Sequence, residues 1–240
     1  MQSFIDMKIS VVLAAYKGEK YIAEQISSIL PQLKEDDEII VSDDYPQGET
    51  KKAVMSFNDS RIKYIEGPGK GVTANFEYAI KCSTGDVIFL CDQDDVWMPN
   101  KVQEVMKLIE NGSDLVLHDA CVTDSFLNTI SPSFFAIHSS NASFLKNIIR
   151  NSFVGCCMAF TRNVADAALP FPKDVPMHDW WIALIAIKKG FKVSLLNEPL
   201  IKWRRHGDNV TGGKTSALQK LKWRLKIISY LIPSCQGKDQ

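Results

Sequence analysis

The sequence lacks the cysteine patterns and the long apolar runs that mark several common protein classes. Its six cysteines include no Cys-x-x-Cys pair, which argues against the usual zinc and dithiol motifs, and most lie in apolar segments, as expected for reduced thiols. No apolar run reaches the roughly 18 residues that a membrane-spanning helix needs, and no basic N-terminal region precedes an apolar run. We therefore expect a cytoplasmic protein that is neither secreted nor membrane-spanning.

Neither sign of charge is in excess, because 28 Lys and Arg residues balance 28 Asp and Glu residues. This balance argues against a nucleic-acid-binding domain, and we predict no nucleic-acid partner. Glycine-rich phosphate loops are also absent: no Gly-x-Gly-x-x-Gly motif follows the first predicted strand, and the loop 67–71 is not a Gly-x-x-x-x-Gly-Lys-Ser/Thr loop. A bound nucleotide would therefore be held by acids, an aromatic side chain and a metal ion.

The most informative segment is Val87–Trp97, in which a short apolar run ends in the carboxylates Asp92, Asp94 and Asp95. Such a run predicts a buried strand that opens at its carboxyl end onto a polar crevice. Asp92 and Asp94 are expected to point the same way, where they would repel each other unless a cation or ligand hydroxyl groups lay between them. Carboxylate oxygens suit Mg²⁺ or Mn²⁺. The alternative is a solvated acidic turn, with Asp95 near the N-cap of a following helix.

Strand-like and helix-like segments alternate along the chain, which is long enough for a substantial core. Strands are predicted at 9–15, 38–42, 62–65, 87–91, 114–118, 153–160, 193–196 and 200–203, and helices at 21–30, 51–57, 72–82, 101–110, 142–149 and 181–188. This order predicts an α/β fold with a mostly parallel central sheet and helices on both faces. Ligands bind such sheets beyond the carboxyl ends of the strands. The residues at these ends are Tyr16, Asp43, Asp44, Asp92 and Asp94.

The tail from Ser216 onward has the pattern of a basic amphipathic helix. Its apolar positions are Leu218, Leu221, Leu225, Ile228 and Ile232, and its basic positions are Lys220, Lys222, Arg224 and Lys226. Two interpretations stay open: the apolar face packs on the rest of the protein, or the helix lies on anionic lipid with its charges toward the headgroups. We accordingly divide the chain into a domain of residues 1–213 and a tail of residues 214–240.

Six segments together resemble a family-2 glycosyltransferase with the nucleotide-diphospho-sugar (A-type) fold, over residues 7–213. They are Ser10–Tyr16, Ser42–Asp44, Gly71–Glu77, Asp92–Trp97, His178–Trp181 and Arg205–Val210, in the order of the family. The fourth and the last look most like the bacterial subgroup that builds O-antigens, capsules and other surface polysaccharides, which includes rhamnosyltransferases. The resemblance implies a nucleotide-sugar-binding half at about 7–100 and an acceptor-binding half at about 101–213.

The resemblance also implies a role for each matching residue. Tyr16 would flank the pyrimidine base, Asp43 would bond its edge, and Asp92 would contact the ribose. Asp94 would bind the Mn²⁺ or Mg²⁺ ion that bridges the two donor phosphates, with His206 as a further ligand. The other residues expected at the donor nucleotide are Ala15, Glu19, Asp44, Asn75 and Gln93. The residues expected near the pyrophosphate or the acceptor are Arg204, Arg205, Asp95, His178, Trp180 and Trp181.

Asp179 matches the acid that deprotonates the acceptor hydroxyl in the family, which implies an inverting single displacement. A carboxylate base must lie within hydrogen-bond reach and be partly desolvated, and Trp180 and Trp181 would supply an apolar wall. The alternative is an acid at a helix start that the helix dipole stabilises. The family's usual Glu before this acid is His178 here, which would lower the pKa of the base if it were charged.

Two other positions depart from the family pattern. Asp43-Asp44 is followed by Tyr45 to Gly48 rather than by the usual Asp-Gly-Ser, and Ala74 stands where an Arg often precedes the Asn75 equivalent. The first departure puts the base and ribose contacts of this loop in doubt. The second removes one candidate contact with the donor phosphates.

The implied activity is transfer of a hexosyl or deoxyhexosyl group from a UDP- or dTDP-sugar to a lipid-linked or oligosaccharide acceptor in bacterial surface-polysaccharide synthesis. Because lipid-linked acceptors reside at the inner leaflet, the resemblance favours peripheral contact of the tail with the cytoplasmic face of the inner membrane. One alternative is a sugar-phosphate nucleotidyltransferase, whose usual Gly-rich, Arg/Lys-containing signature is missing from Ala14–Glu19. The other is a non-catalytic nucleotide- or sugar-binding module, against which the presence of Asp94 and Asp179 argues.

Overall fold

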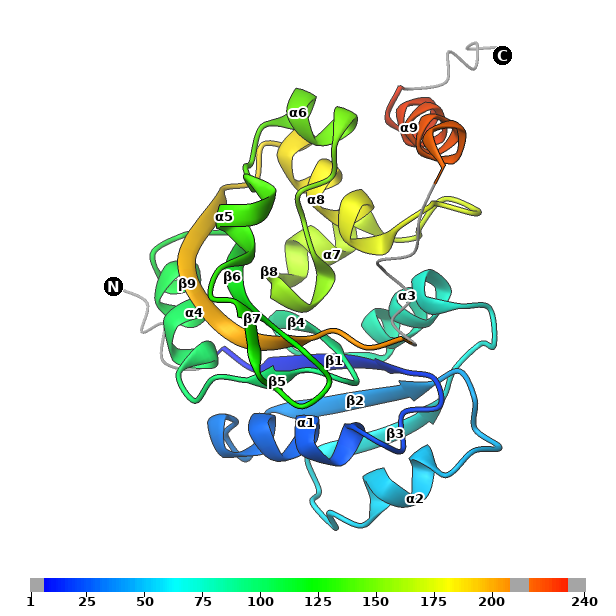
Figure 1. The fold of residues 1–240 in the computed structure, drawn as a ribbon, viewed down its shortest axis with the longest axis vertical. Coiled ribbons are helices and arrows are strands. Elements are labelled where there is room, and N and C mark those ends of the chain that lie inside the picture. The colour runs from blue at the N-terminus through cyan, green and yellow to red at the C-terminus, as the bar shows by residue number, and fades with distance from the viewer. Residues whose placement is uncertain (1–6, 208–215, 233–240) are drawn as a thin grey trace, which may run out of the picture.

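The computed structural model describes residues 7–207 and 216–232, and a nine-stranded mixed sheet lies at its centre (Figure 1). The strands are β1 (Ile9–Ala15), β2 (Glu38–Asp43), β3 (Ile62–Glu66), β4 (Val87–Asp92), β5 (Val96–Trp97), β6 (Leu115–Thr123), β7 (Thr129–Ser131), β8 (Met158–Thr161) and β9 (Val193–Arg204). The helices are α1 (Ile22–Ile29), α2 (Thr50–Met55), α3 (Val72–Cys82), α4 (Lys101–Glu110), α5 (Phe134–His138), α6 (Phe144–Ile149), α7 (Arg162–Ala168), α8 (His178–Lys188) and α9 (Ala217–Leu231), and the 3-10 turns are η2 (Leu30–Gln32) and η3 (Gly155–Cys157).

The strands pair in the order β3-β2-β1-β4-β8-β6-β9-β5, and β7 pairs with β6. All strands of the N-terminal half, β1 to β4, run parallel, with crossover helices between them. Their near-continuous apolar sequences follow from burial on both faces: every residue of β1 and β2 is buried. The predicted α/β class with helices on both faces is therefore confirmed, and the acids that end β2 and β4 share one edge of the sheet.

The C-terminal half of the sheet is mixed rather than parallel. β8 lies antiparallel between β4 and β6, and β9 is one long strand with register shifts, where the sequence predicted two strands at 193–196 and 200–203. The predicted strand at 153–160 was wrong over its first half, because Gly155–Cys157 is a 3-10 turn. The short elements β5, β7, α5 and α7 were not predicted, since an amphipathic period cannot be read from so few residues.

Glu38 joins the amino ends of the parallel strands. Although the residue is only 1% exposed, it accepts hydrogen bonds from Ser10 Oγ at 2.6 Å, Lys63 Nζ at 2.6 Å and the Thr84 backbone N–H at 2.6 Å. Burial alone would raise its pKa, but the hydrogen bonds from Lys63, Ser10 and Thr84 outweigh it and lower the pKa to about 2. The charged form of Glu38 is therefore built into the fold.

We expect Glu38→Gln to lower the free energy of unfolding by about 2 kcal/mol at pH 7, the low end for a broken buried charge network, because Lys63 stays half-exposed. Since the folded pKa lies below the unfolded value, the stabilisation is present above about pH 4.5 and is lost as the pH falls toward 2. Urea titrations between pH 2 and 7 test this. The exposed Glu49→Gln is the control, and equal stability of the two variants at pH 7 would contradict the prediction.

The predicted helical tail is confirmed as α9, although residues 208–215 and 233–240, which include Asp208 to Val210 of the last motif, lie outside the described residues. The helix packs through Ile227 and Leu231, which are buried, whereas Leu218, Leu221, Leu225 and Ile232 are exposed. The Tyr230 hydroxyl donates to the Lys173 carbonyl oxygen at 2.5 Å. Among the described helices, none has the length and apolarity to cross a bilayer.

Candidate active site

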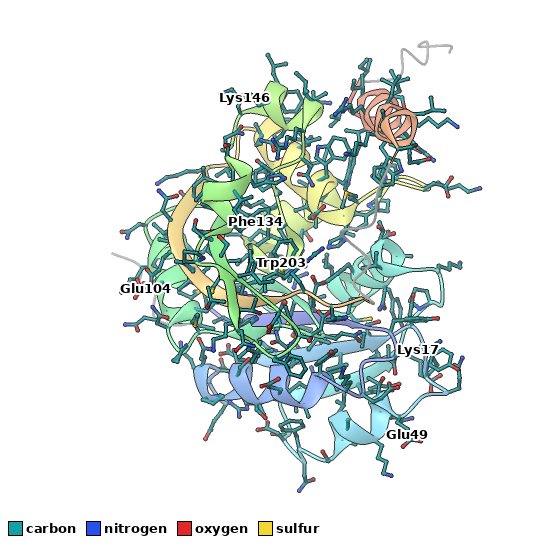
Figure 2. All side chains as sticks on the ribbon, in the orientation of Figure 1. Lys17, Glu49, Glu104, Phe134, Lys146 and Trp203 are labelled. Atoms are coloured by element: carbon teal, nitrogen blue, oxygen red, sulfur yellow. The ribbon has the colours of Figure 1, made fainter. Side chains whose placement is uncertain are left out.

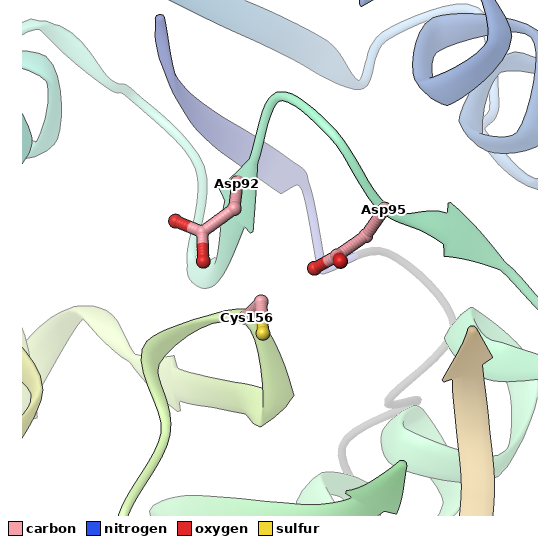
Figure 3. Close-up of side chains that lie close together, drawn as sticks. All are labelled: Asp92, Asp95 and Cys156. Carbon is pink, nitrogen blue, oxygen red and sulfur yellow. The ribbon is translucent and has the colours of Figure 1, made fainter. Parts of the chain in front are cut away.

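The carboxyl end of β4 turns sharply at Asp92, so the alternation of side chains expected for Asp92 and Asp94 stops there. Gln93 and Asp94 form a turn, and the chain re-enters the sheet as β5 at Val96. Asp92 and Asp95 consequently face each other across the turn, with Cys156 of η3 between them (Figure 3), while Asp94 points toward the end of β9. The alternative of a solvated acidic turn before a helix is wrong, because Asp95 is only 1% exposed and a strand follows.

Asp94 and His206 meet although 112 positions separate them. His206 Nε2 lies 2.8 Å from Asp94 Oδ2, and their side chains are 9% and 13% exposed respectively. The imidazole stacks on Tyr21, with ring centroids 4.9 Å apart. The two residues predicted as metal ligands thus form one partly buried pair of an oxygen and a nitrogen ligand, which is a set that Mn²⁺ accepts. Their role as ligands stays a prediction.

A second group of three side chains, Asp92, Asp95 and Cys156, also has metal-ligand character. One ligand atom from each lies within 4.8 Å of the others (Figure 3). In the absence of a metal ion, the hydrogen bond with Cys157 together with burial raises the pKa of the Cys156 thiol well above its usual value, which favours the protonated thiol. The protonated thiol hydrogen-bonds to the two carboxyl groups. We therefore interpret this group as a hydrogen-bonded cluster that holds Asp92 in place.

The surroundings of Asp92 raise the pKa of its carboxyl group. Burial first, and then the neighbouring charges of Asp94 and Asp179, raise its pKa to about 7. Burial first, and then the neighbouring charges of Asp94 and Asp92, raise the pKa of Asp95 well above its usual range. Acids so close together favour a cation or a hydrogen-bond donor from a ligand between them. This crowding is the electrostatic signature of a site rather than of a surface turn.

Lys101 is fully buried beside this cluster, a position that the sequence analysis missed. Its Nζ donates to the Cys156 carbonyl oxygen at 2.9 Å and lies 4.0 Å from the centroid of the Trp97 ring. Its charge lowers the pKa of Asp92, against the larger effect of burial. The available signal was a lysine at the start of a predicted helix, only six residues after Asp95.

Asp179 lies in the first turn of α8, on the other side of Asp92. Oδ1 accepts from the Trp180 backbone N–H at 2.5 Å and from Asn151 Nδ2 at 3.5 Å, and the Gly155 backbone N–H adds a hydrogen bond. Burial nevertheless dominates and raises the pKa to about 6. Asp179 is only 6% exposed. Its carboxyl group is therefore largely desolvated, as a proton acceptor must be.

The condition under which His178 would lower the pKa of this base, a charged imidazole, is not met. His178 is buried, and its ring stacks on Phe76 with centroids 4.0 Å apart. Burial lowers its pKa to about 3, so the imidazole is neutral at physiological pH. It packs against Gly155, where a Cβ would lie 2.7 Å from His178 Nε2, so only glycine fits there. The neutral ring does not lower the pKa of Asp179, which burial raises.

Tyr16 is the exposed aromatic side chain at the end of β1. It is 55% exposed and meets Tyr45 edge-on, with centroids 5.6 Å apart, while Lys17 Nζ lies 5.4 Å from its centroid. Gln93 fixes the backbone of Tyr16, because its Oε1 accepts from the Tyr16 N–H at 2.8 Å and its Nε2 donates to the Tyr16 carbonyl at 3.0 Å. Gln93 therefore links the two strand ends, and Tyr16 is free to stack on a planar ligand.

Several residues predicted to bind the donor nucleotide form hydrogen bonds within the protein. Asp43 is buried and accepts from the Tyr64 hydroxyl at 2.9 Å and the Tyr45 N–H at 3.0 Å. Asp44 accepts from the N–H groups of Gly69 and Gly71 and so shapes the 67–71 loop. Asn75 Nδ2 donates hydrogen bonds to the carbonyl oxygens of Ala15 and Ser42, and Glu19 accepts a hydrogen bond from Thr50 Oγ1. These residues shape the crevice, and their ligand contacts stay predictions.

The four remaining predicted residues are placed by contacts within the protein. Arg204 is 4% exposed, and its guanidinium donates hydrogen bonds to Glu24 and to the carbonyl oxygens of Asp94 and Ser125. It therefore holds the backbone of Asp94 in position. The Arg205 guanidinium lies 4.8 Å from the Trp203 ring centroid. The indole N–H groups of α8 donate to backbone carbonyls: Trp180 to Asn147 at 2.7 Å, and Trp181 to Ala168 at 2.8 Å.

Comparison with known proteins gives the family of the chain. The model of the family described as "Glycosyl transferase family 2" matches residues 10–168. The Escherichia coli protein named UDP-Glc:alpha-D-GlcNAc-diphosphoundecaprenol beta-1,3-glucosyltransferase WfgD is 26% identical over 222 residues, which cover 90% of this chain and 84% of that protein. The chain spans two thirds or less of several other relatives, 66% of one and 34% of another.

Solved structures share the fold. Staphylococcus aureus TarS in complex with UDP-GlcNAc has a TM-score of 0.75 at 17% identity, over 93% of this chain and 66% of that chain. Glucosyl-3-phosphoglycerate synthase from Mycobacterium tuberculosis, in complex with Mn²⁺, UDP and glucosyl-3-phosphoglycerate, has a TM-score of 0.60 at 19% identity, over 98% of this chain and 82% of that chain. Since the family model matches residues 10–168, well over half of the chain, the chain belongs to glycosyl transferase family 2.

Proposed function

We propose that this protein is a metal-dependent, inverting glycosyltransferase that moves a sugar from a UDP- or dTDP-sugar to a lipid-linked or oligosaccharide acceptor in bacterial surface-polysaccharide synthesis. The observation that carries the proposal is the convergence of Asp94 with His206, and of Asp92 with Asp179, at the carboxyl end of β4. One pair suits a divalent ion and the other places a desolvated base next to it. The name of the WfgD relative supports a lipid diphosphate acceptor.

The donor half of the site fits a nucleotide diphosphate. Asp94 and His206 supply the oxygen and nitrogen ligands for Mn²⁺ or Mg²⁺, and Tyr16 offers an exposed ring on which a base stacks. A divalent ion held there stabilises the charge that develops on the leaving diphosphate. Asp92, at the end of β4, would accept a hydrogen bond from ribose.

Asp179 acts as the general base. Its carboxylate takes the proton of an acceptor hydroxyl, the freed oxygen attacks the anomeric carbon of the donor, and the bond from that carbon to the diphosphate oxygen breaks. A single in-line displacement of this kind inverts the anomeric configuration. The hydrogen bonds from Asn151 and Gly155 hold the carboxylate in one orientation, and burial keeps it basic.

The helix α9 is proposed to touch the cytoplasmic face of the inner membrane. Residues 216–232 contain no Asp or Glu, and Lys220 and Lys222 are exposed. The exposed Leu218, Leu221 and Leu225 lie on the face that does not pack on the domain. An apolar stripe among basic side chains is the pattern of a helix that binds anionic lipid. Such contact would bring the site close to a lipid-linked acceptor.

A thermal-shift measurement tests the donor site. UDP or dTDP with Mn²⁺, at about 100 times its Kd, is expected to raise the unfolding midpoint by about 5 °C or more, because ligand binding to the folded state adds about 2.7 kcal/mol. EDTA should abolish the shift. GDP and CMP are the matched comparisons for the base. The donor-site assignment is wrong if no nucleotide shifts the midpoint with either Mn²⁺ or Mg²⁺.

A further inference from the structure

A cavity of about 310 Å³ lies between α5 and α6, outside the carboxylate site. Lys146 and Arg150 stand in its wall, together with polar side chains that include His138 (Figure 2 labels Lys146). Neither cation has a carboxylate partner among residues 7–207 and 216–232. The cavity therefore holds uncompensated positive charge.

The sequence around the cavity carries no negative charge at all. No Asp or Glu occurs between Asp124 and Asp166, a stretch that contains the whole cavity wall. Burial and then the charge of Arg150 lower the pKa of His138. Within the described part of the chain, His138 Nδ1 and Ser140 Oγ are buried without a hydrogen-bond partner. Cations without partners, together with unsatisfied polar atoms, fit an anionic ligand that accepts several hydrogen bonds.

The cavity wall is preorganised by a network of amide side chains. Asn147 Nδ2 donates to the Asn141 carbonyl at 2.7 Å, and Ser152 Oγ donates to Asn147 Oδ1 at 2.8 Å. The Asn147 carbonyl accepts from Trp180 Nε1 at 2.7 Å. This network fixes α6, which carries Lys146 and ends at Arg150, and the residues on either side of it to helix α8. A rigid wall loses little conformational entropy when a ligand binds.

The same loop leads directly to the proposed base. Arg150 and Ser152, both in the cavity wall, flank Asn151, whose Nδ2 reaches Asp179 Oδ1 at 3.5 Å. The Asn151 side chain therefore connects the segment that forms the cavity wall to the base. A ligand held by Arg150 would therefore present the group attached to it to Asp179.

Exposed apolar side chains lie on the helices at and next to the cavity. Ile149, in the cavity wall, is 64% exposed, Leu145 of the same helix is 71% exposed, and α6 contacts α9, which exposes Leu221 and Leu225. We propose that this cavity binds the diphosphate of a polyprenyl-linked acceptor, with Lys146 and Arg150 on the phosphates and the polyprenyl chain over α6 and α9. This assignment rests on the proposed glycosyl transfer and names the acceptor group that the enzyme recognises.

Titration calorimetry with farnesyl diphosphate in EDTA tests the cavity without metal at the donor site and without turnover. Charge-assisted hydrogen bonds to phosphate are stronger than neutral ones, so Lys146→Ala/Arg150→Ala is expected to weaken binding at least about 10-fold. Inorganic pyrophosphate should bind the unaltered protein more weakly than farnesyl diphosphate, because it lacks the apolar chain. The control is Lys52→Ala/Lys107→Ala, which removes two lysine charges from exposed helix surface.

Equal affinity of the Lys146→Ala/Arg150→Ala variant and the unaltered protein for farnesyl diphosphate would overturn the cavity assignment. Equal affinity of the unaltered protein for pyrophosphate and farnesyl diphosphate would overturn the lipid part of it. These results are independent of the donor site, because the nucleotide thermal shift requires metal. A protein that shows the nucleotide shift but no farnesyl diphosphate binding keeps its proposed function and loses this acceptor cavity.

Discussion

Asp179→Asn is expected to lower kcat by about 1,000-fold and to leave the affinity for UDP with Mn²⁺ unchanged. General-base catalysis contributes about 10²–10⁴-fold, and burial of Asp179, with its pKa raised to about 6, makes it an effective acceptor near neutral pH. The amide keeps the shape and the hydrogen bond from Asn151 but takes no proton. The measurement is donor turnover with a saccharide acceptor, alongside calorimetry for the nucleotide.

The pH profile gives an independent test of the same base. Because Asp179 works in its ionised form, kcat/KM should rise with pH through about 6 and level off above it, in enzyme saturated with metal. The variant should lose this limb. The exposed Asp166→Asn on α7 makes the same chemical change away from the site and should retain both the rate and the limb. Turnover of Asp179→Asn at the unaltered rate would remove Asp179 as the base.

The parallel half of the fold could be predicted because its strands are buried on both faces. Each reads as a short apolar run that stops at a polar residue, as Val87 to Cys91 does before Asp92. The C-terminal half of the sheet could not be predicted in this way. β8 pairs antiparallel with both β4 and β6. The 3-10 turn η3 replaces the start of the predicted strand, because Gly155 packs closely against the His178 ring. That close approach depends on tertiary packing and leaves no periodic signal.

The candidate site divides in the same way. Acids at strand ends and the family resemblance led to Asp94, His206 and Asp179, and the structure brings these residues to one edge of the sheet. The charge state of His178 could not be predicted from the sequence. His178 is neutral because it is buried against Phe76, and no local sequence pattern records that contact. The buried Lys101 was missed for the same reason, since lysines are rarely fully buried and the sequence shows no partner for its ammonium group.

His206→Ala is expected to weaken Mn²⁺ binding and metal-dependent turnover by at least about 100-fold, because even the outer partners of metal ligands are worth about 10–100-fold. Asp94→Asn should have a similar effect. The measurement is Mn²⁺ titration by electron paramagnetic resonance, in the presence of UDP, together with turnover at saturating donor. Asp166→Asn again serves as the control for loss of one carboxylate.

A hydrogen bond between Asp94 and His206 predicts a second property that separates a metal site from a structural pair. Nε2 and Oδ2 are 2.8 Å apart, so the two atoms that a metal ion would need are in contact with each other. A metal ion competes with protons for the lone pairs of its ligands, so Mn²⁺ affinity should fall as the pH is lowered. In His206→Ala this pH dependence should be reduced along with the affinity. If instead the variant binds Mn²⁺ as tightly as the unaltered protein and only unfolds at a lower temperature, His206 holds the end of β9 in place through Asp94 and Tyr21 and is no ligand.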